Sequence, residues 1–223
     1  MAKTASNSSL HIRRLILVPA AITLGITMLR LIGELEHWPS RWFSAAAGGG
    51  LAIVGISWLP FIFGPYFAVK LTRSGHGPSS LLKAFGFTAL GFLVLFVAVF
   101  VGFLPKFNYP GKEAVGYLLV AFAASIVTLG WPALFRVLVA YGYAARIPVA
   151  ILMLFAIHGR WGTHYDVLPP RYTGATSFLA VYMQIAFLPQ MVVWIAQTVL
   201  MGALAGIIVA AVMFRGNRPA VAS

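Results

Sequence analysis

The stretch "LGFLVLFVAVFVGFL", Leu90 to Leu104, contains no polar side chain. It belongs to a largely apolar run from Leu81 to Leu104, which is long enough to cross the roughly 30 Å hydrocarbon core of a bilayer as a helix. The whole chain shares this character: 61% of its 223 residues are hydrophobic, 9% are charged, and its mean hydropathy is +0.91. A soluble domain has about 25% charged residues. The composition therefore predicts an all-α polytopic membrane protein.

About six transmembrane helices are expected from the apolar runs, with five and seven as the neighbouring counts. In a single membrane domain of residues 1–223, the predicted spans are 14–33, 48–71, 81–104, 114–140, 147–163 and 191–214. The first run is too long for a signal-peptide core and no cleavage site follows it, so it is interpreted as a retained helix. "AAAGGG", Ala45 to Gly50, leads into the second span, where missing side chains allow helices to approach closely. Pro189 is expected to separate an interfacial or re-entrant helix at 176–188 from the last span.

The 45 residues from Ala114 to His158 are too long for one span and just long enough for two. We predict the turn at "YGYAAR", Tyr141 to Arg146, because Pro148 then falls in a first helical turn, where proline is tolerated. The alternative turn is "GWP", Gly130 to Pro132. It would leave Arg146 in the middle of a span.

The distribution of basic residues predicts that both termini are cytoplasmic, because cytoplasmic segments of membrane proteins carry an excess of lysine and arginine. With six spans, the cytoplasmic side receives most of the basic residues: Lys3, Arg13, Arg14, Lys70, Arg73, Lys83, Arg136, Arg146, Arg215 and Arg218. The outer side keeps Arg41, Lys106, Lys112, Arg160 and Arg171. All four acidic residues, Glu34, Glu36, Glu113 and Asp166, fall on the outer side. This asymmetry favours an outer-face site.

The net charge of +12 is spread between apolar segments and forms no basic stripe on a soluble face. It therefore indicates contact with anionic lipid headgroups on the cytoplasmic side and argues against a nucleic-acid partner. The expected location is an inner or plasma membrane, crossed several times. A homo-oligomer or a membrane complex is compatible with this composition. Cysteine is absent, which excludes disulfides and thiolate metal sites.

A first candidate polar site lies in "RLIGELEHWPSRWF", Arg30 to Phe43. If the first helix continues to His37, then Arg30, Glu34 and His37 share one face, with Glu36 close by. They would bind an anion or a metal, or move a proton. The simpler interpretation is an ion-paired helix end anchored at the interface by two tryptophans.

A second candidate lies in "HGRWGTHYDVLPPRYTG", His158 to Gly174, where His158, His164 and Asp166 occur together. Such residues, together with carboxylates, are common metal ligands, although this spacing matches no known metal motif. The candidate metal ligands are Glu34, His37, His158, His164 and Asp166. The alternative is a folded, aromatic-rich cap over the helix ends.

Gln190 and Gln197 lie seven positions apart, on one face of the last helix if it begins at Gln190, and are candidates for a polar pathway or for hydrogen bonds between helices. Three functions remain open at this stage: a small-solute permease or channel-like protein, a membrane enzyme or metal or redox protein with an outer-face site, and a non-catalytic subunit or scaffold. A permease needs polar side chains from several helices to converge, whereas a scaffold needs a packed interface without a pocket. The sequence identifies no cofactor and no catalytic residue.

Overall fold

The computed structural model describes residues 11–50, 52–170, 172, 174 and 176–216; Lys3, Arg171 and Arg218 lie outside them. Within the described residues the chain is all-helical and has no strand. The helices are α1 (Ile12–Leu35), η1 (Ala47–Gly49), α2 (Pro60–Arg73), α3 (Leu81–Gly102), α4 (Lys112–Ser125), α5 (Val127–Gly130), α6 (Pro132–Gly159), α7 (Phe178–Tyr182), η2 (Met183–Phe187), η3 (Pro189–Val193) and α8 (Trp194–Gly216). Five helical stretches of the described chain are long and apolar enough to cross a membrane: Ile12–Leu35, Leu81–Gly102, Lys112–Gly130, Pro132–Gly159 and Phe178–Met213.

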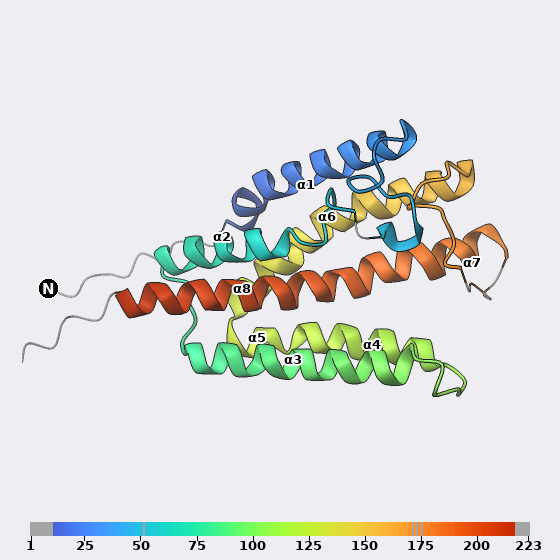
Figure 1. Ribbon diagram of the computed structural model, residues 1–223. Coiled ribbons are helices and arrows are strands. Elements are labelled where there is room, and N and C mark those ends of the chain that lie inside the picture. Colours follow the sequence, from blue (N-terminus) through green and yellow to red (C-terminus); the bar gives the residue numbers. More distant parts are fainter. Residues whose placement is uncertain (1–10, 51, 171, 173, 175, 217–223) are drawn as a thin grey trace, which may run out of the picture.

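The helices form an elongated bundle around α8 (Figure 1). Helix α8 packs against α2, α3 and α6, α1 packs on α6, and α3 pairs with α4 as a hairpin along one side. The start of α1 and the end of α8 lie at the same end of the bundle (Figure 1). The end of α1, the start of α4 and the loop after α6 lie at the opposite end, so the four acidic residues gather there.

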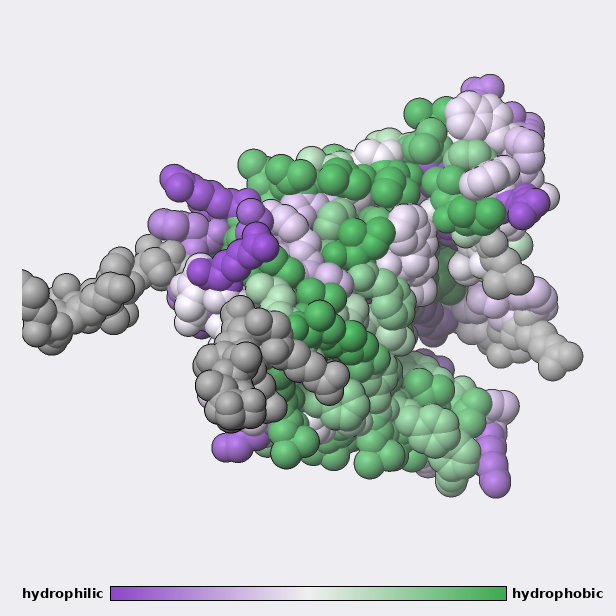
Figure 2. Space-filling view, turned by 60° about the vertical axis from the view of Figure 1, so that its left-hand side comes forward, coloured by the Kyte–Doolittle hydropathy of each residue, from purple (hydrophilic) through white to green (hydrophobic). Residues whose placement is uncertain are grey.

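The core is built from buried apolar side chains where α2, α6 and α8 meet, including Phe67, Leu134, Leu138 and Leu200. Hydrophobic side chains also cover the outside of the bundle between two more hydrophilic ends (Figure 2). Residues such as Leu82, Leu118 and Phe96 are at least two-thirds exposed, at 81%, 71% and 69%. Water would penalise such exposure and lipid would not, so this surface is that of a membrane protein.

The second predicted span, 48–71, is wrong in its first half. The described residues of this span up to Leu59 form an irregular segment with one short 3-10 turn, and α2 begins only at Pro60. Gly48, Gly49 and Gly50 all have positive φ, at 69°, 83° and 54°. Glycine adopts this conformation readily but a regular helix does not contain it, so these glycines form a non-helical loop instead of packing a helix closely.

The predicted turn at Tyr141 to Arg146 is also wrong, because α6 runs through it without interruption. The chain turns at the alternative site, where Trp131 has a non-helical backbone and Pro132 opens α6. Proline is well suited to a first helical position because its missing N–H is not needed there. The indole of Trp131 donates to the carbonyl of His76 at 2.8 Å and fixes this break. Arg146 is therefore in the middle of α6.

The last region is a continuous helical run from α7 to α8, and no separate helix ends at 188. Pro189 has no N–H to donate, and the chain accommodates this with the π-helical turns η2 and η3 instead of a break. The run is therefore longer than the predicted span 191–214, and it brings Gln190 inside the bundle, where the residue is 7% exposed.

Candidate functional site

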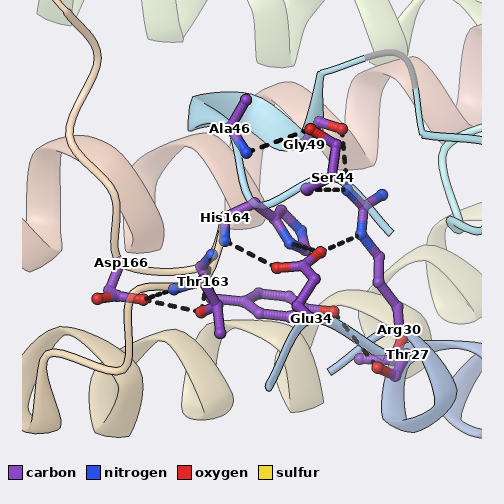
Figure 3. A network of polar contacts seen from close by, with 10 residues as sticks. Thr27, Arg30, Glu34, Ser44, Ala46, Gly49, Thr163, His164 and Asp166 are labelled. Carbon is purple, nitrogen blue, oxygen red and sulfur yellow. Dashed lines mark hydrogen bonds and ion pairs between the residues drawn. The ribbon is translucent and has the colours of Figure 1, made fainter. Parts of the chain in front are cut away.

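Three charged or polar side chains meet where α1 ends, and their centre is the carboxylate of Glu34 (Figure 3). Nε of Arg30 donates to Oε1 of Glu34 at 2.8 Å, one helical turn away. The backbone N–H of His164 donates to Oε2 at 2.8 Å, and Nδ1 of His164 lies 2.6 Å from Oε1. A carboxylate only accepts hydrogen bonds, so Nδ1 carries the proton. The Glu34 side chain is 0% exposed, and both of its oxygens accept hydrogen bonds. The carboxylate therefore links the loop after α6 to α1.

The irregular segment before α2 closes around the other side of Arg30. Nη2 of Arg30 donates to the carbonyl of Gly49 at 2.9 Å and to the carbonyl of Ser44 at 3.1 Å. A Cβ atom added to Gly49 would lie 2.6 Å from Nη2 of Arg30. The glycine run therefore serves two needs, a positive φ and a close approach to the guanidinium.

The loop after α6 is itself held in one conformation by Asp166. Its carboxylate accepts from the backbone N–H of Gly162 at 2.9 Å, and from the N–H and hydroxyl of Thr163 at 2.8 and 2.7 Å. Tyr165 turns into the bundle, where its hydroxyl donates to the carbonyl of Thr27 at 3.4 Å. Asp166 is thus the organiser of this loop.

Burial shifts the pKa values of two side chains in this loop, His164 and Tyr165. The pKa of His164 lies below its ordinary value because the buried ring is poorly solvated when charged; the hydrogen bond to Glu34 opposes this shift, and the nearby Arg30 guanidinium adds to it. The pKa of Tyr165 is raised, again chiefly by burial. Both side chains are therefore neutral near pH 7.

A cavity of about 470 Å³ lies inside this end of the bundle. Its walls come from α1, the irregular segment before α2, the α3–α4 hairpin, α6, the loop after α6, and the η2–η3–α8 run. The surface is hollowed on this side, between the α3–α4 hairpin and the rest of the molecule (Figure 2). Non-helical backbone at membrane depth is tolerated where it lines such a cavity, and Gly55, Ile56 and Ser57 do so.

Arg146 is the most unusual residue of the cavity wall. It is only 4% exposed, and no Asp or Glu among the described residues forms an ion pair with it. Its guanidinium lies 4.6 Å from the ring centroid of Trp194, and Nη1 donates to Oε1 of Gln190 at 3.4 Å. An arginine at the centre of a membrane helix costs about 2.5–3.5 kcal/mol and commonly marks a functional site. Stacking and one long hydrogen bond offset only part of this cost.

The charges around the cavity are arranged by depth. The charge of Arg30 is balanced by Glu34, and Glu113 lies at the exposed start of α4. Arg146 is halfway along α6 and keeps its charge without a carboxylate among the described residues. The deep part of the cavity is therefore positively charged.

The structure brings some of the predicted site residues together and leaves others apart. Arg30, His164 and Gln190 line the cavity, Glu34 bonds two of them, and Gln197 donates to the carbonyl of Ser57 at 2.8 Å.

Glu36 and His37 lie beyond the end of α1 and are exposed; His37 has φ 55°, so it does not continue the helical face of Arg30 and Glu34. His158 is exposed in the last turn of α6, where its ring contacts Phe178. Among the described residues, no group of three or more His, Cys, Asp or Glu is placed to hold a metal ion.

Sequence reasoning missed the role of Arg146, of the glycine loop and of Tyr165. A signal for the first was present: Pro132 is a stronger helix breaker than any residue in "YGYAAR", where the strongest breaker is Gly142. No protein-family model, curated protein or solved structure matches this chain.

Proposed function

We propose that this chain is a small-solute permease or channel-like protein of a cell membrane, and that its solute is an anion bound in the cavity beside Arg146. The observation that carries the proposal is the buried guanidinium of Arg146, which faces the cavity and lacks a carboxylate among the described residues. A bound anion would supply the missing negative charge. Arginine suits phosphate, sulfate and carboxylate groups because its planar donors match their oxygens.

The architecture around the cavity also supports transport. Polar groups converge from α1, α6 and η3. Transporters typically build their sites from irregular stretches of their helices near the middle of the membrane. Here the non-helical segment before α2 and the π-helical turns η2 and η3 both line the cavity. A scaffold would favour a packed interface without a pocket.

The proposal includes the orientation. Both termini face the cytoplasm of an inner or plasma membrane, where the basic residues contact anionic lipid headgroups. The cavity then lies toward the outer face.

The test is anion binding and flux with a matched arginine control. Purified protein in nanodiscs is titrated with inorganic phosphate, sulfate, ethyl phosphate and acetate, and proteoliposomes report uptake of the anion that binds. Arg146→Gln should abolish binding and flux, whereas Arg160→Gln, at an exposed arginine that caps α6, should leave both unchanged. Equal behaviour of the two variants, or no binding of any of the four anions, would overturn the proposal.

A further inference from the structure

A second, apolar groove of about 200 Å³ is lined by α4, α6 and the η3–α8 run, farther along α4 and α6 from the acidic end of the bundle than the charged cavity. On α4, Glu113 and Tyr117 line the cavity, and Ala121 and Ala124 line the groove. These residues are spaced by four, four and three positions, so they share one face of the helix. A single face of α4 thus leads from the rim of the cavity into the groove.

Helix α6 repeats this order in the opposite direction. Val139 and Tyr143 line the groove, and Arg146 and Val149 line the cavity, again at spacings of four, three and three. On α6, the groove residue Tyr143 and the cavity residue Arg146 are three positions apart, so the groove continues along this helix from Arg146 toward Pro132. The remaining wall of the groove comes from Val192 and Ile195 on the η3–α8 run.

The groove is apolar and reachable from the lipid. Its described lining residues carry no charge, and only Ser125 and Tyr143 among them have a polar group. Ala121 and Tyr143 are exposed on the side of the bundle. A hydrocarbon chain can therefore enter from the bilayer, while its polar end remains level with Arg146.

We infer that the anion of the proposed site is the headgroup of a single-chain amphiphile, whose chain lies in this groove; the inference rests on the proposed function. The charge at one end and the apolar walls at the other match a molecule with an anionic head and one hydrocarbon tail. A free hydrophilic anion would use the cavity and leave the groove to lipid.

The experiment compares ligands with and without a chain in nanodiscs of zwitterionic lipid. Ethyl phosphate, dodecyl phosphate and the neutral dodecyl maltoside are titrated by calorimetry, with empty nanodiscs correcting for partition into the bilayer. Ala121→Trp fills the groove, and Leu118→Trp is its control on the exposed side of the same helix. Ala121→Leu provides a smaller version of the same change, and circular dichroism with thermal melting verifies that each variant folds.

We expect Ala121→Trp to lower the affinity for dodecyl phosphate about tenfold, which corresponds to about 1.4 kcal/mol of binding free energy. The affinity for ethyl phosphate should not change. Ala121→Leu should lower the affinity for dodecyl phosphate by a smaller factor. If the tryptophan variant does not fold, Ala121→Leu is used in its place. Leu118→Trp should not change the affinity for any of the three ligands. Arg146→Gln should lower the affinity for both phosphates and should not change the affinity for dodecyl maltoside.

If the groove variants and Leu118→Trp bind dodecyl phosphate with the same affinity, and ethyl phosphate binding still requires Arg146, the inference fails and the proposed function stands. If neither phosphate depends on Arg146, both fail.

Discussion

The carboxylate of Glu34 on α1 contacts both the backbone N–H and the ring of His164, at 2.8 and 2.6 Å, although the two residues are 130 positions apart. The same carboxylate holds Arg30. One buried acid therefore ties together α1 and the loop after α6, and through Arg30 it also holds the glycine loop before α2. These are three of the walls of the cavity, so the shape of the cavity depends on Glu34.

Replacing Glu34 by glutamine should strongly destabilise the protein. The size of the side chain is retained, but Arg30 is left buried without its counter-charge. Removing one partner of a buried ion pair typically costs about 3–5 kcal/mol. Chemical denaturation in detergent micelles measures the free energy of unfolding. Glu36→Gln is the control, because Glu36 is exposed two positions away and should change stability by less than about 0.5 kcal/mol. Similar losses in both variants would contradict a special role for Glu34.

Stability should fall when the pH drops below about 6.5, the ordinary pKa of histidine. Burial lowers the pKa of His164 in the folded state, so between this lowered pKa and 6.5 the unfolded chain binds more protons than the folded one. Stability is therefore complete above pH 6.5, is lost as the pH falls through the window, and levels off below the folded pKa.

Free energies of unfolding measured from pH 7.5 to 5 should show this slope in the wild type and a smaller one in His164→Gln. His158→Gln, at an exposed histidine, serves as the control and should keep the wild-type slope. A slope that survives in His164→Gln would assign the effect to another group.

Substituting the two arginines of the cavity should change the stability of the protein differently. Arg30→Met leaves Glu34 buried with only His164 as partner, so we expect a loss of at least about 2 kcal/mol. Arg146→Met removes a buried charge that has no carboxylate among the described residues, so stability should stay constant or rise by about 1 kcal/mol, while phosphate binding is lost. The free energy of unfolding and the affinity for phosphate are measured for both variants. A large loss of stability in Arg146→Met would make that arginine structural.

Much of the fold was readable from the sequence because hydrocarbon thickness alone dictates the length of an apolar helix. The first and third spans agree closely with α1 and α3. The Arg30–Glu34 pair also followed from helical spacing, and the structure confirms it.

What could not be predicted depends on tertiary contacts. The cost of placing Arg146 inside a span argued against the turn at "GWP", yet a cavity, Trp194 and Gln190 receive the charge, and none of these is visible locally. The conformation of the glycine loop depends on the guanidinium of Arg30, which it surrounds. The contact between Glu34 and His164 joins distant segments, and a single sequence carries no signal for it.

Helix α2 is held to α8 by a contact between two glycines, and this contact yields a last prediction. A Cβ atom on Gly64 would collide with the backbone oxygen of Gly202. Gly64→Ala should therefore destabilise the protein by about 1–3 kcal/mol, because backbone on both sides must move apart. Gly86→Ala in α3 is the matched control, since nothing lies within 4 Å of its added Cβ. There the higher helix propensity of alanine should raise stability by about 0.5–1 kcal/mol. Unfolding curves of both variants in the same detergent measure the difference, and a gain at both positions would show that α2 and α8 are not in this close contact.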